Sequence, residues 1–329
     1  MTIEQNSVLL EVNNLKMHFP VSESIFSKSK TVLKAVDGVS FTINRGETFG
    51  LVGESGSVKT TTGKCILGIH NPTDGNIIYN GIDITKLSKN EAKKFLREKQ
   101  MIFQDPYGSL DPRRSAFTIV KDAIVADGHK IPKGELKDKV NSLLELVELD
   151  PVIGTRYPHE MSGGQRQRLG IARALACDPK LIVCDEPVSA LDVSIQAQII
   201  NLFEELQEKM KLTYLFIAHD LAVVRHISDY VGVTYLGKLV EVTDSRELYK
   251  NPLHPYTKAL LSAIPLTNYE VERKRNRIML QGDIPSPINT PTGCPFHPRC
   301  IYARKECLTC MPPLREISKG HKVACHIVN

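Results

Sequence analysis

Short apolar runs alternate with helix-like patterns along most of the chain. The strand-like runs occupy residues 9–12, 40–43, 48–52, 75–84, 181–184, 214–218, 231–236 and 238–243. Apolar side chains recur at 3.6-residue spacing between 136 and 147, which predicts a helix with one buried face. Strands that alternate with helices favour an α/β core with a mainly parallel sheet. The stretch 106–177 is mostly helical in pattern and predicts a helical subdomain.

Turn residues mark where the chain reverses. Asn80-Gly81 predicts a hairpin within 75–84, and Gly237 joins the last two strand-like runs. Ser88 and Glu91 have the spacing of a capping box, which predicts a helix that begins there. The hairpins indicate an antiparallel β subdomain in addition to the parallel core.

The pattern changes at Asn251. Proline and glycine become frequent, helical periodicity fades after Ile264, and five of the eight cysteines lie between residues 294 and 325. We expect one large domain over 1–250 and a cysteine-rich C-terminal extension over 251–329. The core of such an extension is too small to be stable without a staple.

Composition narrows the function classes. The chain has 329 residues, 42% of them hydrophobic, and a net charge of +5 that is too small and too evenly spread for a dedicated nucleic-acid binder. The basic run Arg273-Lys274-Arg275, with Arg277, fits a solvated linker better than a binding patch. No apolar stretch approaches the ~18 residues of a membrane-spanning helix, and residues 1–14 do not resemble a signal peptide. We therefore expect a cytosolic chain that reaches a membrane only through partners.

A glycine-containing segment joins the run 48–52 to the helix that begins near Lys59. The backbone N–H groups of such a loop, together with the positive end of the helix, bind phosphate oxygens. Lys59 is expected to reach the β- and γ-phosphates of a nucleotide, and the Thr60 hydroxyl to ligate Mg²⁺. The candidate ATP-binding residues of this loop are Gly53, Glu54, Ser55, Gly56, Ser57, Val58, Lys59, Thr60 and Thr61.

Val58 departs from the usual loop pattern, which has glycine immediately before the lysine. It adds a β-branched side chain where backbone and phosphate approach closely. If the position also requires an unusual backbone conformation, the strain is ~1–3 kcal/mol, equivalent to roughly a tenfold to hundredfold loss of nucleotide affinity. The alternative is that the loop tolerates Val58 with an ordinary negative φ. The first hypothesis predicts weak binding or hydrolysis of ATP.

Two acidic residues end the apolar run 181–184. Adjacent carboxylates at the end of a buried strand are costly unless they are solvated or bound to a cation. We expect Asp185 to hold Mg²⁺, directly or through water, and Glu186 to polarise the attacking water as general base.

A second anion site is predicted ahead of the helix 166–176. Serine is a good N-cap, and two glycines leave backbone N–H groups uncovered. The residues of this segment are Ser162, Gly163, Gly164 and Gln165.

These segments, with Gln104 and His219, occur in the order found in the nucleotide-binding subunits of ABC transporters, which the chain resembles. The resemblance implies an ABC-type P-loop ATPase fold. It implies that His219 contacts the γ-phosphate and orients the water, and that Gln104 contacts the metal or the water. Mg²⁺ would then be held through Thr60, Gln104 and Asp185.

The resemblance also implies a dimer. In ABC proteins the segment Ser162–Gln165 faces phosphates held by the other subunit. The loop through which paired subunits communicate is matched here by Ser189, Ala190, Leu191 and Asp192. Phe19 occupies the place of the aromatic residue that packs against adenine, although a core phenylalanine explains it equally well.

Longer stretches narrow the resemblance to the ATP-binding subunits of oligopeptide and dipeptide ABC importers. They are Tyr157–Met161, Asp185–Asp192, Asn251–Thr257 and Cys294–Cys300, and the likeness extends from about Leu9 to the end of the chain. Such subunits are cytoplasmic and peripheral to the cell membrane, work as non-identical pairs beneath two permeases, and receive substrate from an external binding protein. The segment Asp105–Phe117 stands where this family docks its permeases.

In this family the C-terminal cysteines are associated with a [4Fe-4S] cluster. Cys294, Cys300, Cys307 and Cys325 stand at matching places, with five, six and seventeen residues between them. Four thiolates suit an iron–sulfur cluster or tetrahedral zinc, and the absence of Cys-x₂-Cys pairs favours iron–sulfur. Cys310 is a fifth candidate. The other cysteines are predicted in the core: Cys65, Cys177 and Cys184.

Three functions of different class remain to be distinguished. The first is the ATPase of a peptide importer, and the second is a soluble ABC ATPase that acts in DNA repair or translation. The third is a regulatory subunit that binds nucleotide with negligible turnover, a hypothesis that rests on Val58. Soluble ABC ATPases usually carry coiled-coil insertions or two fused ATPase domains, and the sequence contains neither, which favours the importer.

Overall fold

The chain divides into two compact units. The computed structural model describes residues 7–21, 31–54, 58–126, 132–265 and 277–328. Unit 1 consists of residues 1–7, 44–47 and 86–217, and unit 2 of residues 8–43, 48–85 and 218–329. Two predictions lie outside the described residues, namely those on the loop residues Ser55, Gly56 and Ser57 and on the basic run Arg273–Arg275.

Unit 1 is built on three parallel strands in the order β8-β7-β6. They are β6 (Lys99–Ile102), β7 (Leu181–Asp185) and β8 (Thr213–Ala218). Val183 of β7 pairs with Met101 on one side and with Leu215 on the other, and every residue of β7 and β8 is buried. The sequence predicted β7 and β8, and it missed β6.

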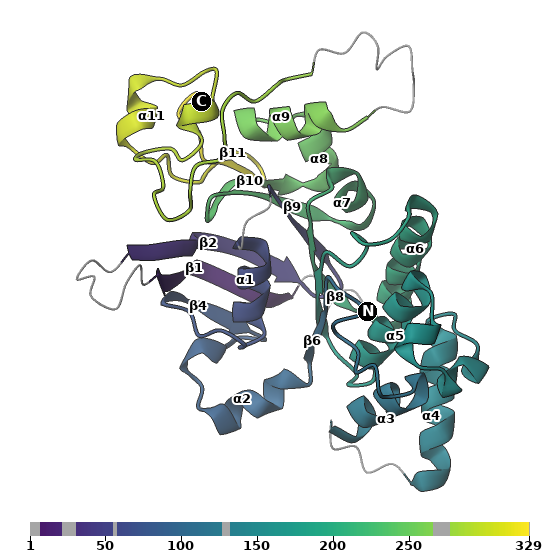
Figure 1. The fold of residues 1–329 in the computed structure, drawn as a ribbon. Coiled ribbons are helices and arrows are strands. Elements are labelled where there is room, and N and C mark those ends of the chain that lie inside the picture. Colours follow the sequence, from purple (N-terminus) through teal and green to yellow (C-terminus); the bar gives the residue numbers. More distant parts are fainter. Residues whose placement is uncertain (1–6, 22–30, 55–57, 127–131, 266–276, 329) are drawn as a thin grey trace. The chain divides into compact units, whose positions relative to one another are not determined.

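In Figure 1 the helices α3 (Ala116–Ala126), α4 (Lys133–Leu146), α5 (Gly163–Leu175) and α6 (Val193–Met210) of unit 1 lie together on one side of these strands. Helix α2 (Lys89–Leu96) lies apart from them and precedes β6 in the chain. The helices α3, α4 and α5 contact one another and form the predicted helical subdomain. The face of α4 that was predicted from its periodicity is buried at Val140, Leu143 and Leu144. The capping box of Ser88 and Glu91 begins α2 as predicted.

Unit 2 contains the predicted antiparallel sheet, in the order β2-β1-β4-β5. Its strands are β1 (Val8–Val21), β2 (Thr31–Asn44), β4 (Asp74–Tyr79) and β5 (Ile82–Asp83). Asn80 and Gly81 have φ of 51° and 77°, the left-handed values that a tight two-residue hairpin turn requires. The hairpin prediction is therefore confirmed.

A second group of strands in unit 2 has the order β11-β12-β10-β9-β3. Here β3 (Thr48–Val52) is parallel to β9 (Tyr230–Tyr235), and the remaining pairs with β10 (Lys238–Asp244), β12 (His321–Val323) and β11 (Arg315–Ser318) are antiparallel. The helices of this unit are α1 (Val58–Ile66), α7 (Leu221–Ile227), α8 (Ser245–Lys250), α9 (Pro255–Ala263) and α11 (Lys305–Thr309). In Figure 1 the C-terminal segment, drawn in yellow, contains β11 and lies beside β10. The domain boundary predicted after residue 250 stays a prediction, and β12 pairs with β10 across it.

A buried carboxylate joins β10 to the segments that follow it. Glu241 is fully buried and accepts hydrogen bonds from the backbone N–H groups of Leu253 (2.7 Å) and His254 (2.9 Å). Its carboxylate also lies 2.8 Å from Nε2 of His321 on β12. Burial opposes ionisation of Glu241, but the hydrogen bonds from His321 and the two N–H groups outweigh it and lower the pKa of the carboxyl. One side chain thus fixes the start of α9 and the position of β12.

Within the described ranges, no helix combines the length and the apolar character that crossing a membrane requires.

Candidate nucleotide site

The phosphate loop follows β3 and ends at α1, the strand–loop–helix order that was predicted. Gly53 closes the strand with a φ of 154°, and a Cβ added there would lie 2.2 Å from the carbonyl oxygen of Thr234. Thr234 of β9 also donates a hydrogen bond from its hydroxyl to the carbonyl of Val52 (2.9 Å). Only glycine fits this position because β9 passes directly over it.

Lys59 is held by the carbonyl groups at the start of the loop. Its ammonium donates to the carbonyl oxygens of Gly53 (2.8 Å) and Glu54 (3.2 Å), and the residue is 3% exposed. Thr60 follows it, half-buried, in the first turn of α1, and Thr61 is buried. The charge predicted to bind phosphate is therefore at the loop, fixed by backbone oxygens that lie close to it.

Val58 is the first residue of α1 and is buried. It is not among the non-glycine residues with positive φ, and its carbonyl accepts a hydrogen bond from the Thr62 hydroxyl (2.8 Å). The hypothesis of backbone strain at Val58 is therefore wrong, and its ordinary helical conformation explains how the loop accommodates a β-branched residue. The other part of the hypothesis, that the Val58 side chain weakens ATP binding by crowding the phosphate, stays a prediction.

The acidic pair in unit 1 stands where β7 ends. Asp185 is 4% exposed, and Glu186 follows in the left-handed region with φ of 46°. The N–H of Glu186 donates to the carbonyl of Ile217 at the end of β8 (2.9 Å), and its carboxylate accepts from Nε2 of Gln104 (2.8 Å). Left-handed conformation in a non-glycine residue costs about 1–3 kcal/mol and is characteristic of functional positions. The predicted base and the predicted sensor of the nucleotide are thus hydrogen-bonded to each other.

Two further candidates lie in unit 2. His219 follows β8 and is exposed, and the next residue, Asp220, caps α7 by accepting from the N–H of Ala222 (2.7 Å). Phe19 is half-buried near the end of β1, where its ring meets His70 edge-on at 5.6 Å between centroids. Phe19 is therefore not a core residue, and its contact with adenine stays a prediction.

The signature segment caps α5. Ser162 is the N-cap and forms a capping box with Gln165, whose N–H donates to the Ser162 hydroxyl (3.3 Å). The two glycines pack tightly: a Cβ on Gly163 would lie 3.3 Å from Leu191, and one on Gly164 would lie 2.8 Å from Cγ2 of Ile195. This close packing joins the signature to the predicted dimer loop.

The dimer loop connects the acidic strand end to α6. The Ser189 hydroxyl donates to the carbonyl of Glu186 (3.0 Å). Ala190 is exposed, and Asp192 caps α6 by accepting from the N–H of Ile195 (3.0 Å). Hydrogen bonds from the Ser194 hydroxyl and from backbone N–H groups lower the pKa of Asp192. In unit 1 the predicted dimer loop therefore contacts both the predicted base, through Ser189, and the signature, through Leu191.

Two arginines of α5 hold the segment that was predicted to dock permeases. Arg173 donates to the carbonyl of Ser109 and lies over the ring of Phe103 at 5.8 Å from its centroid. Arg166 lies over the ring of Tyr107 at 5.5 Å. Phe103 and Tyr107 are exposed aromatic residues. No role was predicted for these arginines from the sequence, although Arg166 directly follows the signature and both lie on the helix that it begins.

Four cysteines of the C-terminal extension surround one small cavity. Cys294, Cys300, Cys307 and Cys325 line a space of about 10 Å³, with Phe296 at the same wall. Burial raises the pKa of the Cys294 thiol to about 11, and the neighbouring thiols add to the rise. A cavity of this volume holds one water-sized group. Cys310 is exposed and does not line it.

The fit of these cysteines to a metal is incomplete. Four thiols that face one cavity are the donor set of an iron–sulfur or zinc site. However, no set of three or more His, Cys, Asp or Glu side chains within the described ranges is arranged to hold a metal ion. Of the three cysteines predicted in the core, Cys65 and Cys184 are buried, which confirms the prediction for them. Cys177 is only half-buried, so the prediction is wrong for that residue.

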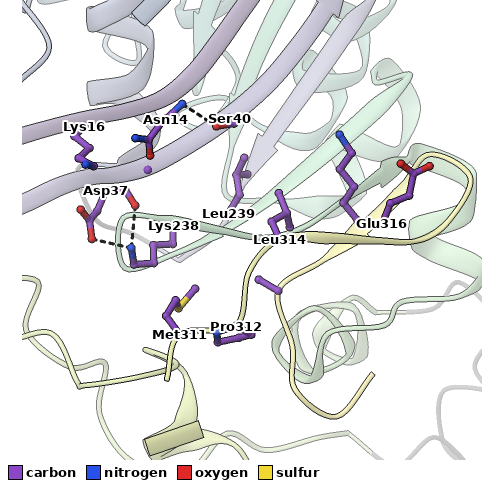
Figure 2. Close-up of a pocket in the computed structure, with 13 residues that line it drawn as sticks. Asn14, Lys16, Asp37, Ser40, Lys238, Leu239, Met311, Pro312, Leu314 and Glu316 are labelled. Atoms are coloured by element: carbon purple, nitrogen blue, oxygen red, sulfur yellow. Dashed lines mark hydrogen bonds and ion pairs between the residues drawn. The ribbon is translucent and has the colours of Figure 1, made fainter. Parts of the chain in front are cut away.

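A larger cavity of about 440 Å³ in unit 2 contains none of the predicted ATP residues. Figure 2 shows Lys238 next to Asp37, with which it forms a 2.8 Å ion pair, and Met311, Pro312 and Leu314 also line the cavity. A second lysine of the lining, Lys16, pairs with Asp74 at 2.8 Å. These two ammonium groups are bound by carboxylates, so the cavity offers neither of them unpaired to an anion.

The chain matches two protein-family models and is similar to known proteins over its length. The model of the ABC transporter family matches residues 36–189, and that of the oligopeptide/dipeptide transporter C-terminal region matches 240–307. The chain is 52% identical to the oligopeptide transport ATP-binding protein AppF of Bacillus subtilis, over 99% of each chain. It is 49% identical to OppF of Salmonella typhimurium, an oligopeptide transport ATP-binding protein, over 98% of this chain and 97% of that one.

Solved structures are similar in fold. A dimeric post-hydrolysis state of the ATP-binding cassette MJ0796 bound to ADP and Pi has a TM-score of 0.64 and 26% identity, covering 72% of this chain and 99% of that one. CbiO1 of Clostridium perfringens, part of the transporter complex cbiONQ, has a TM-score of 0.63 and 25% identity, covering 74% and 91% of the two chains. The ABC ATPase fold is therefore shown.

Two glycines of α5 allow a matched test of the signature packing. Gly164→Ala should destabilise the chain by about 1–3 kcal/mol because the methyl group overpacks against Ile195. Gly170→Ala, in the same helix with nothing within 4 Å of the added Cβ, should stabilise it by about 0.5–1 kcal/mol. Urea unfolding of both variants measures the difference. Equal effects of the two substitutions would contradict the packing described for the signature.

Proposed function

Because the chain belongs to the family of ATP-binding subunits of oligopeptide and dipeptide ABC transporters, we propose that it powers the import of oligopeptides or dipeptides. The observation that carries most weight is the arrangement at Glu186. A carboxylate in a left-handed backbone position ends a buried strand and is bound by Gln104 at 2.8 Å. This geometry fits a base held ready for a water molecule.

The roles of the residues follow from their chemistry. Lys59 and the loop N–H groups bind the phosphates of ATP, and Mg²⁺, when bound, would be held by Thr60, Gln104 and Asp185. Glu186 accepts a proton from the attacking water as the water oxygen bonds to the γ-phosphorus. The bond from the γ-phosphorus to the bridging oxygen of ADP breaks, which releases ADP and inorganic phosphate. His219 contacts the γ-phosphate and orients that water. Phe19 packs against adenine, which contributes about 1 kcal/mol.

A second ATP-binding subunit completes the site in this proposal. The N-terminus of α5, capped by Ser162, carries uncovered N–H groups and the positive end of a helix dipole. It faces phosphates held by a homologous, non-identical subunit, and Ser189–Asp192 contact that partner. Two composite sites form in each heterodimer.

The segment Asp105–Phe117 transmits the motion to two permeases at the cytoplasmic face of the membrane. Its exposed aromatic residue Tyr107 lies under Arg166, four residues after Ser162 in the signature helix. Movement of the signature on ATP closure therefore displaces the docking segment directly. Substrate is delivered to the permeases by an external binding protein.

The alternatives receive less support. A soluble ABC ATPase of repair or translation would not need the C-terminal region that the oligopeptide transporter model matches over 240–307. A degenerate regulatory subunit rested on strain at Val58, whose backbone is ordinary.

Loss of the base tests the proposed function. In vesicles that carry the full importer, Glu186→Gln should abolish ATP-driven uptake of an oligopeptide and lower the hydrolysis rate by 10²-fold or more, since general-base catalysis contributes about 10²–10⁴-fold. ATP binding by the variant, measured by displacement of a fluorescent analogue, should persist. Uptake that is unaffected by the substitution would overturn the proposal.

Val58 is tested by the reverse substitution. Backbone strain at Val58 would weaken ATP binding by at least about tenfold. Because the backbone of Val58 is not strained, we expect Val58→Gly to change ATP affinity by less than about tenfold. Equilibrium titration with Mg-ATP checks this. A gain of tenfold or more would establish that the native side chain weakens the site.

We further propose that Cys294, Cys300, Cys307 and Cys325 hold a [4Fe-4S] cluster that staples the extension, with zinc as the alternative. The cavity of about 10 Å³ has room for a single ion, so a cluster requires the four thiols to move apart. The bound group would supply four metal–thiolate bonds and no redox step. An anaerobic preparation should contain about four irons and four sulfides per chain, and Cys300→Ser should lower both. Zinc without sulfide would identify the alternative, and a chain free of both would refute the staple.

A further inference from the structure

Glu54, the second residue of the phosphate loop, is held by the C-terminal extension. Its carboxylate accepts a hydrogen bond from Nη1 of Arg299 at 2.8 Å, although the two residues are 245 positions apart in the sequence. Its backbone N–H donates to the hydroxyl of Tyr256, also at 2.8 Å. All three residues belong to unit 2. Both the side chain and the main chain of Glu54 are therefore fixed from outside the loop.

Glu54 is also an acceptor for the lysine of the loop. The Lys59 ammonium donates to the carbonyl of Glu54 at 3.2 Å and to that of Gly53 at 2.8 Å. A shift of Glu54 displaces one of these oxygens, and the ammonium follows it. Arg299, Glu54 and Lys59 thus form a relay from the extension to the group that binds phosphate.

Arg299 has little freedom of its own. Its side chain is 9% exposed, and its N–H donates to the carbonyl of Phe296 at 3.0 Å. The rings of Tyr235, Tyr256 and Phe296 pack together with centroids 4.8–5.3 Å apart. Within the described ranges, Nε of Arg299 is a buried atom with no hydrogen-bond partner. The guanidinium is therefore compensated chiefly by Glu54, and its Nη1 also donates to the hydroxyl of Tyr235 in this aromatic wall at 3.5 Å.

We propose that the C-terminal extension sets the position of Lys59 through Glu54, so that Arg299 and Tyr256 are positioning residues for ATP binding although neither touches nucleotide. The inference rests on the proposed role of Lys59 in binding phosphate. On this proposal the C-terminal extension contributes to ATP binding in addition to its structural role. Any change of conformation near the cysteine cavity, which Cys300 lines one residue after Arg299, would alter nucleotide affinity.

The test compares variants of the full chain by Mg-ATP affinity and by thermal stability. Arg299→Met removes the charge and should weaken ATP binding by roughly tenfold or more, since small displacements of a positioned group are costly. Arg299→Lys keeps a cationic donor and should recover most of the affinity. Arg246→Met, the same replacement at an exposed arginine of unit 2, should leave affinity unchanged.

Two further variants separate positioning from simple destabilisation. Tyr256→Phe keeps the ring in the aromatic wall and removes only the acceptor for the Glu54 N–H, so it tests the relay even if Arg299→Met fails to fold. Glu54→Gln combined with Arg299→Met should be no weaker in ATP binding than either single variant, because both break the same link.

The outcomes are distinct. If Arg299→Met and Tyr256→Phe lower the melting temperature but leave ATP affinity within about twofold of the parent, the extension is a structural support only and the inference fails. If Lys59→Ala itself does not weaken ATP binding, the proposed role of the loop fails first. Additive losses in the double variant would also contradict a shared relay.

Discussion

The buried carboxylate of Glu241 is the interaction on which the C-terminal part of unit 2 depends. It binds two backbone N–H groups at the start of α9 and lies against His321 of β12. Removing one hydrogen-bond donor from a buried carboxylate costs more than about 1–3 kcal/mol, because the acceptor is left unsatisfied. Through α9 it places Tyr256 against the phosphate loop. The architecture of the extension and the geometry of the loop thus share one anchor.

Unit 1 concentrates its chemistry where a strand ends and a helix begins. Glu186 leaves β7 in a strained conformation that hydrogen bonds from its N–H to Ile217 and from Gln104 to its carboxylate maintain. The same short segment leads to Ser189, which binds back to Glu186, and then to the cap of α6. Strain is retained here because a relaxed backbone would aim the carboxylate elsewhere. These hydrogen bonds fix the carboxylate that we propose as the general base.

The sequence predicted the elements whose signals are local. A short apolar run predicted β3, the pair Asn80-Gly81 predicted the hairpin, and the capping box of Ser88 and Glu91 predicted α2. The order of the motifs predicted the phosphate loop. It missed β6, because four residues carry no usable period and its Lys99 is buried against expectation. It also missed the bond between Glu54 and Arg299, since no local pattern reports a contact across 245 positions. Such contacts depend on tertiary packing alone.

The pairing of β12 with β10 has a consequence for synthesis. Residues 321–323 leave the ribosome after Glu241, whose carboxylate His321 binds in the folded chain. Until then the nascent β10 carries an exposed strand edge and a carboxylate without its histidine, a state in which edges can pair wrongly. The sheet of unit 2 is therefore incomplete when β10 has been synthesised. It can be completed only after the cysteine-rich segment, which contains β12, has been translated.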